Sequence, residues 1–345
     1  MKHFIFIFLL CSLFVLPANA LEFEAPPAPK SVEKYMHNYD NFTDWLIDII
    51  HKALKRVRPD LSSALSVCIQ TICTVIFLSV ADCFPTASKT AAKYVSTIAI
   101  SSILFFSTNS MIQLGTDIIS EMSEYGKLLF PVLTTALAAQ GGITSSAAIY
   151  TGATAFLALA CALISKIFLP MIYLFLGVSA ADCALGENLL NNTKLLIKQI
   201  ISWSLKTLLT IFTAYLSITG TVSGTTDAAA LKATKVTISS FVPVVGSILS
   251  DASEAVLVSV GIAKNAAGIY GIFAILSIFL SPFLKLGTHY LMLKATSSIC
   301  SLFGSKNICN LINDFSTAMG LILAMAGIVC VFLLIAAICF MKGAG

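Results

Sequence analysis

Six long apolar segments determine what this chain can fold into. They cover residues 61–81, 94–114, 143–181, 199–220, 265–293 and 315–341. Each is long enough to cross the roughly 30 Å hydrocarbon layer of a membrane as a helix. Hydrophobic residues make up 57% of the chain and charged residues only 11%, outside the range of soluble domains. One aqueous core cannot bury so much apolar surface. The sequence therefore predicts an all-α polytopic membrane protein with about six transmembrane helices.

The first twenty residues have the pattern of a signal peptide. Lys2 and His3 precede a short apolar stretch over residues 4–16, and residues 18–20 read Ala-Asn-Ala. Small residues at this spacing match a cleavage site. An uncleaved membrane anchor is the alternative. With either, we expect the chain that follows to begin on the extracytoplasmic side.

Residues 21–60 are expected to form an extracytoplasmic spacer and an amphipathic helix. Three prolines between residues 21 and 40 favour an extended spacer. Between residues 42 and 57 the apolar positions recur at helical spacing, and charged residues occupy the other face. Pro59 is expected to end this helix. The helix would lie in the membrane interface or pack against the rest of the protein, and the pattern favours neither.

Prolines reveal an internal repeat. Pro131 and Pro170 are separated by the same distance in sequence as Pro243 and Pro282. An offset of 112 residues superimposes the two pairs, together with the apolar residues around them. Repeats interrupted by proline are common in transporters and channels. The spacing predicts two parallel copies of one membrane unit.

The repeat divides the chain after its spacer. Residues 61–127 would hold two transmembrane helices, residues 128–225 the first repeat and residues 232–341 the second. Within the repeats, residues 128–139 and 236–250 are apolar but too short to cross the membrane. We expect re-entrant half-helices there, because broken backbone at membrane depth must be shielded by protein or line a cavity. The alternative is that they lie flat on the surface.

The half-helices supply the candidate functional positions. Glycines after them would allow tight turns. Asp251 and Glu254 have the spacing of a capping box that starts a helix at Ala252, and this role is favoured over an ion site. The candidate positions are Pro131, Gly141, Gly142, Pro243, Gly246 and Asp251.

Charge predicts the orientation. If residue 21 is outside and six segments cross, the inside loops are 82–93, 182–198 and 294–314, with two lysines each. The outside loop 115–127 is acidic, which agrees with the positive-inside rule. Loop 221–264 contains three lysines and would be outside, against that rule.

Groups that carry enzyme chemistry are missing from the pattern. No nucleophile elbow, phosphate-binding loop or metal-ligand spacing occurs, so we expect no enzyme activity, no metal and no cofactor. Nor does a basic, aromatic surface point to nucleic acid. The ten cysteines are expected to be free thiols.

Four ionisable residues fall inside the apolar segments. Lys166, Lys206 and Lys285 would snorkel from shallow positions or, alternatively, form a polar seam between the repeats. His289 is expected to be a packing residue, because no carboxylate lies one turn away.

Four segments carry a family resemblance. Residues 130–137 read FPVLTTAL, 140–147 read QGGITSSA, 235–252 read KVTISSFVPVVGSILSDA and 264–268 read KNAAG. These segments resemble the stage III sporulation protein AE family of endospore-forming bacteria, and the resemblance covers about residues 60–342.

The resemblance implies a multi-pass protein of the mother-cell membrane that surrounds the forespore. It would be a subunit of a channel or secretion complex that links the two cells and is needed for late forespore development. Its partners would be other stage III sporulation membrane proteins, the lipid bilayer and possible further copies of itself. The family has no catalytic residues to transfer.

Two other functions compete with this expectation. A stand-alone secondary transporter or permease would explain the repeat, but it needs a paired polar site at the membrane midplane, and the apolar segments contain few carboxylates. An intramembrane enzyme would need paired catalytic groups. The transported molecule and the stoichiometry are left open by the sequence.

Overall fold

The computed structural model describes residues 42–81, 89–186, 189–241, 246–303 and 306–342. Side chains are described for residues 61–80, 94–186, 189–219, 267–303 and 306–342. All of these belong to one compact unit, Asn38–Gly345. The predicted signal peptide, the proline-rich spacer and Pro243 lie outside the described residues.

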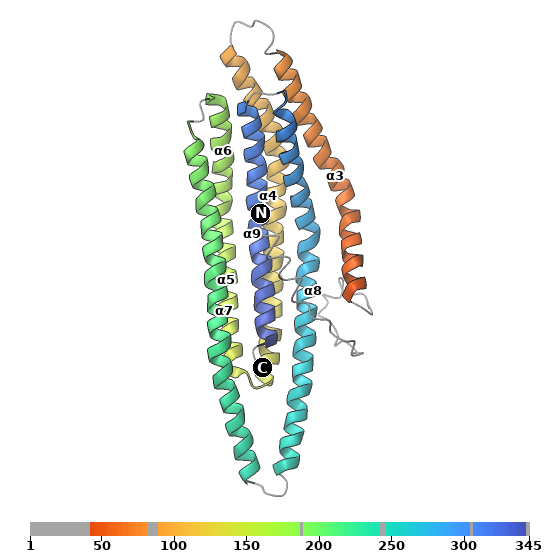
Figure 1. Ribbon diagram of the computed structural model, residues 1–345, viewed down its shortest axis with the longest axis vertical. Helices are drawn as coiled ribbons and strands as arrows, with labels where there is room; N and C mark the ends of the chain where they lie inside the picture. The colour runs from red at the N-terminus through yellow and green to blue at the C-terminus, as the bar shows by residue number, and fades with distance from the viewer. Residues whose placement is uncertain (1–41, 82–88, 187–188, 242–245, 304–305, 343–345) are drawn as a thin grey trace. The chain divides into compact units, whose positions relative to one another are not determined.

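The described chain is helical throughout. The elements are α3 (Phe42–Ala81), α4 (Lys89–Ala139), α5 (Ile143–Leu163), the π-helical turn η1 (Ile164–Phe168), α6 (Leu169–Leu185), α7 (Asn191–Phe241), α8 (Gly246–Cys300) and α9 (Lys306–Lys342). α5, η1 and α6 follow one another as a single rod, so six long rods alternate in direction (Figure 1). All six contain a segment long and apolar enough to cross a membrane. Six long apolar helices in the described part of the chain, as the sequence predicts, are compatible with a polytopic membrane protein.

α9 is the central helix of the bundle. In its most apolar window 67% of the residues are buried, against 22 to 39% in the other five spans. It packs against α4, α5, α6, α7 and α8. Aromatic rings fill part of this contact, as between Phe212 and Phe332, whose centroids lie 4.4 Å apart. The last apolar segment of the sequence thus becomes the core.

The π-helical turn has a local cause. Proline lacks an amide hydrogen, and its ring clashes with the carbonyl four residues earlier. For Pro170 that carbonyl belongs to Lys166, which lies inside η1. A π-helical turn, whose hydrogen bonds span five residues, widens the helix at this carbonyl and so relieves the clash. Pro282 lies within the continuous helix α8.

The predicted half-helices are wrong as separate elements. Residues 128–139 form the end of α4, which is one helix of 51 residues. Residues 115–127, expected as an acidic loop, are also helical within α4. Of the second segment, residues 236–241 belong to α7 and residues 246–250 to α8, and residues 242–245 lie outside the described residues. Good helix formers such as Glu, Met and Leu keep α4 continuous where hydropathy alone suggested a break.

Two predicted helix ends are also wrong. α3 continues through Pro59, so the amphipathic segment and the first span form one helix. α8 begins five residues before Asp251, so this aspartate lies inside a helix and is not its N-cap. A helix that already has a start leaves no unpaired first-turn amides for a cap to satisfy.

The parallel repeat stays a prediction, although the helix directions agree with it. α5–α6 and α8, which contain Pro170 and Pro282, run the same way, and α7 and α9 run the opposite way (Figure 1). The three connections predicted to be inside all join helices at one end of the bundle, the end where α9 begins (Figure 1). This end is called the lysine end below, after the two lysines in each of its predicted loops.

Candidate functional site

A buried ion triad lies at the lysine end. The Nζ atom of Lys194 on α7 lies 2.9 Å from Asp182 Oδ2 on α6 and 2.8 Å from Asp314 Oδ2 on α9. The side chains of Lys194, Asp182 and Asp314 are only 7%, 4% and 17% exposed. One ammonium therefore ties the consecutive helices α6 and α7 to α9, whose Asp314 is 120 residues away in the sequence. With two carboxylates and one ammonium, the triad has a formal charge of −1.

The turn between α6 and α7 positions two members of the triad. α6 ends at Gly186, whose φ of 84° lies in the left-handed region that glycine adopts without strain. Asp182 Oδ1 accepts a hydrogen bond from the amide of Leu190 at 2.9 Å, just before α7 begins. The partial positive charge at the start of a helix also favours a carboxylate there. Asp182 is thus held both by the backbone amide of Leu190 and by the ammonium of Lys194.

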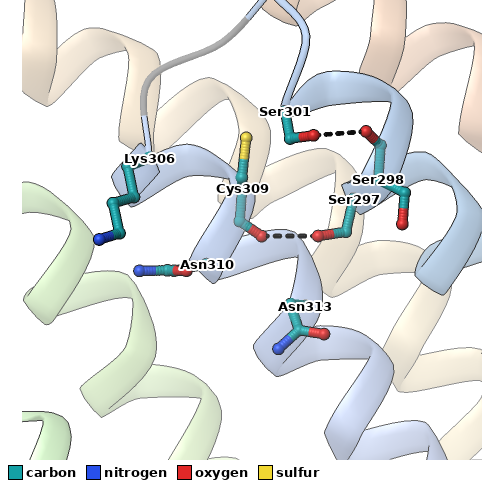
Figure 2. Close-up of a pocket in the computed structure, with 7 residues that line it drawn as sticks. All are labelled: Ser297, Ser298, Ser301, Lys306, Cys309, Asn310 and Asn313. Carbon is teal, nitrogen blue, oxygen red and sulfur yellow. Dashed lines mark hydrogen bonds between the residues drawn. The ribbon is translucent and has the colours of Figure 1, made fainter.

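A polar cavity of about 420 Å³ adjoins the triad. It lies between the end of α8 and the start of α9, and Figure 2 shows its lining. The lining residues are Ser297, Ser298, Ser301, Lys306, Cys309, Asn310 and Asn313. Asn310 also lies against the triad, together with Asp182 and Lys194. Asn310 therefore borders both the cavity and the pocket at Asp182 and Lys194, and the cavity lining and the triad together form the polar region that is the candidate functional site.

Hydrogen bonds hold this lining in place. Ser297 donates to the carbonyl of Cys309 at 2.9 Å, which ties α8 to α9 (Figure 2). Ser301 donates to the carbonyl of Ser298 at 2.6 Å. Lys294 donates to Asn313 Oδ1. Several hydroxyls and amides are thus already used within the protein, and Lys306 is the exposed charge at the rim.

The chemistry of the site is limited to hydrogen bonding and charge. Within the described ranges, no group of three His, Cys, Asp or Glu side chains is placed to hold a metal ion. The cavity can hold water or a small polar group among its hydroxyls, amides and ammonium. The excess negative charge of the triad makes this end of the bundle sensitive to any loss of the lysine.

The sequence-predicted positions lie at the other end of the bundle. Gly141 and Gly142 form the turn between α4 and α5, opposite the triad (Figure 1). Pro131 is exposed on α4. Gly246 is the first residue of α8 and Asp251 lies within that helix. The structure therefore does not join these positions to the polar region at the lysine end.

The predicted tight turn at the glycine pair is confirmed. Gly141 has a φ of 96°, its amide bonds to Ala138 O and the amide of Gly142 bonds to Leu137 O. This pair of bonds is a Schellman motif, which ends α4. Gly142 has an ordinary φ of −85° and is the N-cap of α5. Only the first glycine of the pair needs left-handed backbone.

A substitution at this turn tests its strain. Gly141→Ala should lower the free energy of unfolding by about 1–2 kcal/mol, because a side chain disfavours positive φ. Gly177→Ala is the matched control, since Gly177 lies in α6 and no atom would be within 4 Å of the added carbon. The measurement is the thermal unfolding temperature of both variants in detergent. An equal effect of the two changes would contradict the prediction.

Sequence reasoning missed the triad. The sequence pattern places Lys194 among the lysines of an inside loop and does not distinguish Asp182 or Asp314. The pattern that points to them is two aspartates at the edges of long apolar segments, where an unpaired charge is costly. Of the lysines that were singled out, Lys166 and Lys206 are exposed.

The remaining predictions concern thiols and the histidine. The eight cysteines in the described part of the chain form no disulfide, as predicted. Cys300 and Cys309 are both buried thiols. His289 is buried on α8 and has an interaction partner, which agrees with a packing role.

Comparison with known proteins gives one consistent result. The family described as stage III sporulation protein AE matches residues 30–345. The stage III sporulation protein AE of Bacillus subtilis (strain 168) is 25% identical over 244 residues. That alignment covers 70% of this chain and 61% of the relative, so the matched part spans less than two thirds of the relative's length. No solved structure matches the chain.

Proposed function

Because the chain belongs to the stage III sporulation protein AE family, we propose that it is an integral membrane subunit of the stage III sporulation channel or secretion complex. The complex would link mother cell and forespore and be needed for late forespore development. The protein would lie in the mother-cell membrane around the forespore, delivered by its signal peptide with its N-terminal region extracytoplasmic. Its partners would be other stage III sporulation membrane proteins and further copies of itself.

The position of α9 is the observation that supports a subunit. A single-chain channel needs a polar path through its centre, but here the centre is a helix packed on nearly all sides. Its buried residues include Phe332, Leu333, Ala336 and Phe340. A pore would therefore form between chains and not through one chain. The described charged residues at mid-height lie on outer helices, where a partner could reach them.

A stand-alone transporter or permease has less support. Such proteins bind substrate near the membrane midplane, between repeats and beside broken helices. In this chain the described polar cavity lies at one end of the bundle, between Ser297 and Asn313. α4 and α8 continue as helices through Pro131 and Pro282. We also propose that the chain acts without enzyme chemistry, because its polar region lacks a nucleophile paired with a base.

Affinity capture from sporulating cells tests this proposal. A tagged full-length chain should retain other stage III sporulation membrane proteins in mild detergent, and deleting its gene should stop development after engulfment. The control is the same tag on an unrelated multi-pass protein of the same membrane. Solute uptake by the purified protein alone in liposomes, with no captured partner, would favour the transporter instead.

A further inference from the structure

α3 locates the membrane along the bundle. Its residues Leu61–Val80 contain no charged side chain and span about 30 Å as a helix, which is the thickness of the hydrocarbon layer. The preceding part of the same helix, residues 42–60, contains seven charged residues. The side chains of α3 therefore change from charged to apolar at one position along the helix, residue 61.

The bundle is much longer than this apolar length. The apolar part of α4, Tyr94–Ala139, has 46 residues and rises about 69 Å. The rod from Ile143 to Leu185 has 43 residues. A hydrocarbon layer of roughly 30 Å can surround only about half of either. The other half of each must lie outside the hydrocarbon.

Contacts with α8 place the apolar part of α3 beside the lysine end. Ser79 donates a hydrogen bond to the carbonyl of Phe303 at 2.7 Å, and Cys68 contacts Thr296. Both helices run the same way (Figure 1). Counting seven residues back from the contact between Cys68 and Thr296, Leu61 lies beside His289. Lys285 lies one further turn away, just beyond the end of the apolar segment.

Charged residues on the other outer helices lie at the same height as Lys285. Ser316 of α9 bonds to the carbonyl of Tyr290, so Lys285 lies near residue 321 or slightly beyond it. On α4, Gly115 lies against Ile322, and Asp117 follows two residues later. Lys285 of α8 and Asp117 of α4 therefore lie at nearly the same height along α9. They are the first two members of a ring of charged residues around the bundle.

α7 and the α5–α6 rod complete this ring. Phe212 stacks on Phe332, and Lys206 lies six residues before it. Leu157 of the α5–α6 rod and Leu333 of α9 both lie beside Gly126. The rod runs opposite to α9, and Lys166 follows Leu157 nine residues later. Lys206 and Lys166 thus reach the height of residues 324–326 of α9. Both are exposed, as are Asp117, Glu121 and Glu124.

Exposed side chains differ on the two sides of this ring. Toward the lysine end, outward positions hold large apolar groups: Phe105, Phe106, Tyr173, Leu174, Leu195, Leu196 and Trp203. Beyond the ring, α5 and α7 also expose Ile143, Leu159, Ile211 and Ile218. Most of their outward positions there are nevertheless small or hydroxylated: Thr144, Ala147, Thr151, Ala155, Ala158, Thr210, Thr213 and Ser217. Lipid chains favour the first surface, and water tolerates the second.

We propose that the bilayer surrounds only the lysine-end half of the bundle. The ring at Asp117, Lys166, Lys206 and Lys285 marks one membrane face, and the lysines at the ends of the helices mark the other. The second half, with residues 42–60 of α3 and the α7–α8 hairpin, stands in water. With the orientation proposed above, this half projects on the extracytoplasmic side.

The exposed carboxylates of α4 disfavour a bilayer centred on the whole bundle. Such a bilayer would place Asp117, Glu121 and Glu124 in hydrocarbon, where a charged side chain is costly. Moving the bilayer toward the lysine end removes this cost without changing the fold. The band is narrowest on α7, where Lys198 and Lys206 are about 12 Å apart along the helix, so both side chains would have to snorkel toward the two faces.

Cysteine labelling of the full-length chain in native membranes tests the placement. Thiols in hydrocarbon do not ionise and so do not react with maleimide, whereas thiols in water do. The probes are Ala155→Cys beyond the ring, Leu174→Cys within the proposed band, and the native Cys73, which is exposed on α3. Peptide mass spectrometry follows each site separately, so the native cysteines can remain.

Ala155→Cys should react with N-ethylmaleimide at least tenfold faster than Leu174→Cys and Cys73. After denaturation in dodecyl sulfate all three should react at similar rates, which controls for local chemistry. Equal rates for Ala155→Cys and Leu174→Cys in membranes, or a faster reaction at Leu174→Cys, would overturn the proposal. Both substituted positions are exposed, so neither variant removes core packing.

Discussion

Replacing Lys194 with methionine should destabilise the protein by about 3–5 kcal/mol, because two buried carboxylates lose their shared counter-ion. Asp182 and Asp314 are close to the ammonium at 2.9 and 2.8 Å and nearly closed off from water. Methionine has a similar volume, so the loss is one of charge and not of packing. The measurement is the unfolding temperature in detergent, beside the amount of protein in the membrane.

Two further variants separate charge from packing in this experiment. Lys198→Met removes an exposed lysine one turn along α7 and should change stability by less than about 0.5 kcal/mol. Adding Asp182→Asn and Asp314→Asn to Lys194→Met should recover much of the lost stability, since no uncompensated charge remains buried. If Lys194→Met is as stable as Lys198→Met, the triad does not hold the three helices together.

Replacing Gly152 with alanine should cost on the order of 3 kcal/mol, the second large effect. An added carbon at this position on α5 would lie 1.9 Å from the ring of Tyr215 on α7. The ring cannot simply turn away, because its hydroxyl donates to the carbonyl of Ala148 at 3.0 Å and the ring lies against Phe156 with centroids 5.7 Å apart. The helices α5 and α7 would have to separate.

A matched glycine control and a compensating substitution test whether the contact with Tyr215 causes this loss of stability. Gly287→Ala on α8 adds the same carbon where no atom lies within 4 Å, so it should leave stability unchanged or raise it slightly. Tyr215→Ala should restore room for Gly152→Ala, so the double variant should lose less than the two single losses added together. Strict additivity of the two losses in thermal unfolding would mean that the contact does not limit packing.

The six apolar helices could be predicted because the mean hydropathy of each segment identifies it directly. Segments such as 61–81 and 315–341 are apolar for their whole length, and a helix is the structure that satisfies their backbone in hydrocarbon. The turn at Gly141 could also be predicted, since few other residues adopt its φ of 96°. These features depend on the local chain alone.

Helix boundaries could not be predicted in the same way. Residues 115–127 contain three acidic side chains, which hydropathy interprets as a loop. A helix tolerates such residues on an exposed face, and Asp117, Glu121 and Glu124 lie on one face of α4. Polar side chains therefore do not mark the end of a helix. They indicate only that the helix face on which they lie does not contact an apolar partner.

By itself the sequence determined the family, the helical class and the six spans, because each depends on residues close together in the chain. Only the tertiary structure decided that α9 is the centre and that Lys194 meets Asp182 and Asp314, the second of which is 120 residues away. A charge in an apolar segment looks the same in the sequence whether it is paired, snorkelling or in water. Its partner is fixed by how the helices pack, and that packing depends on contacts among all six spans at once.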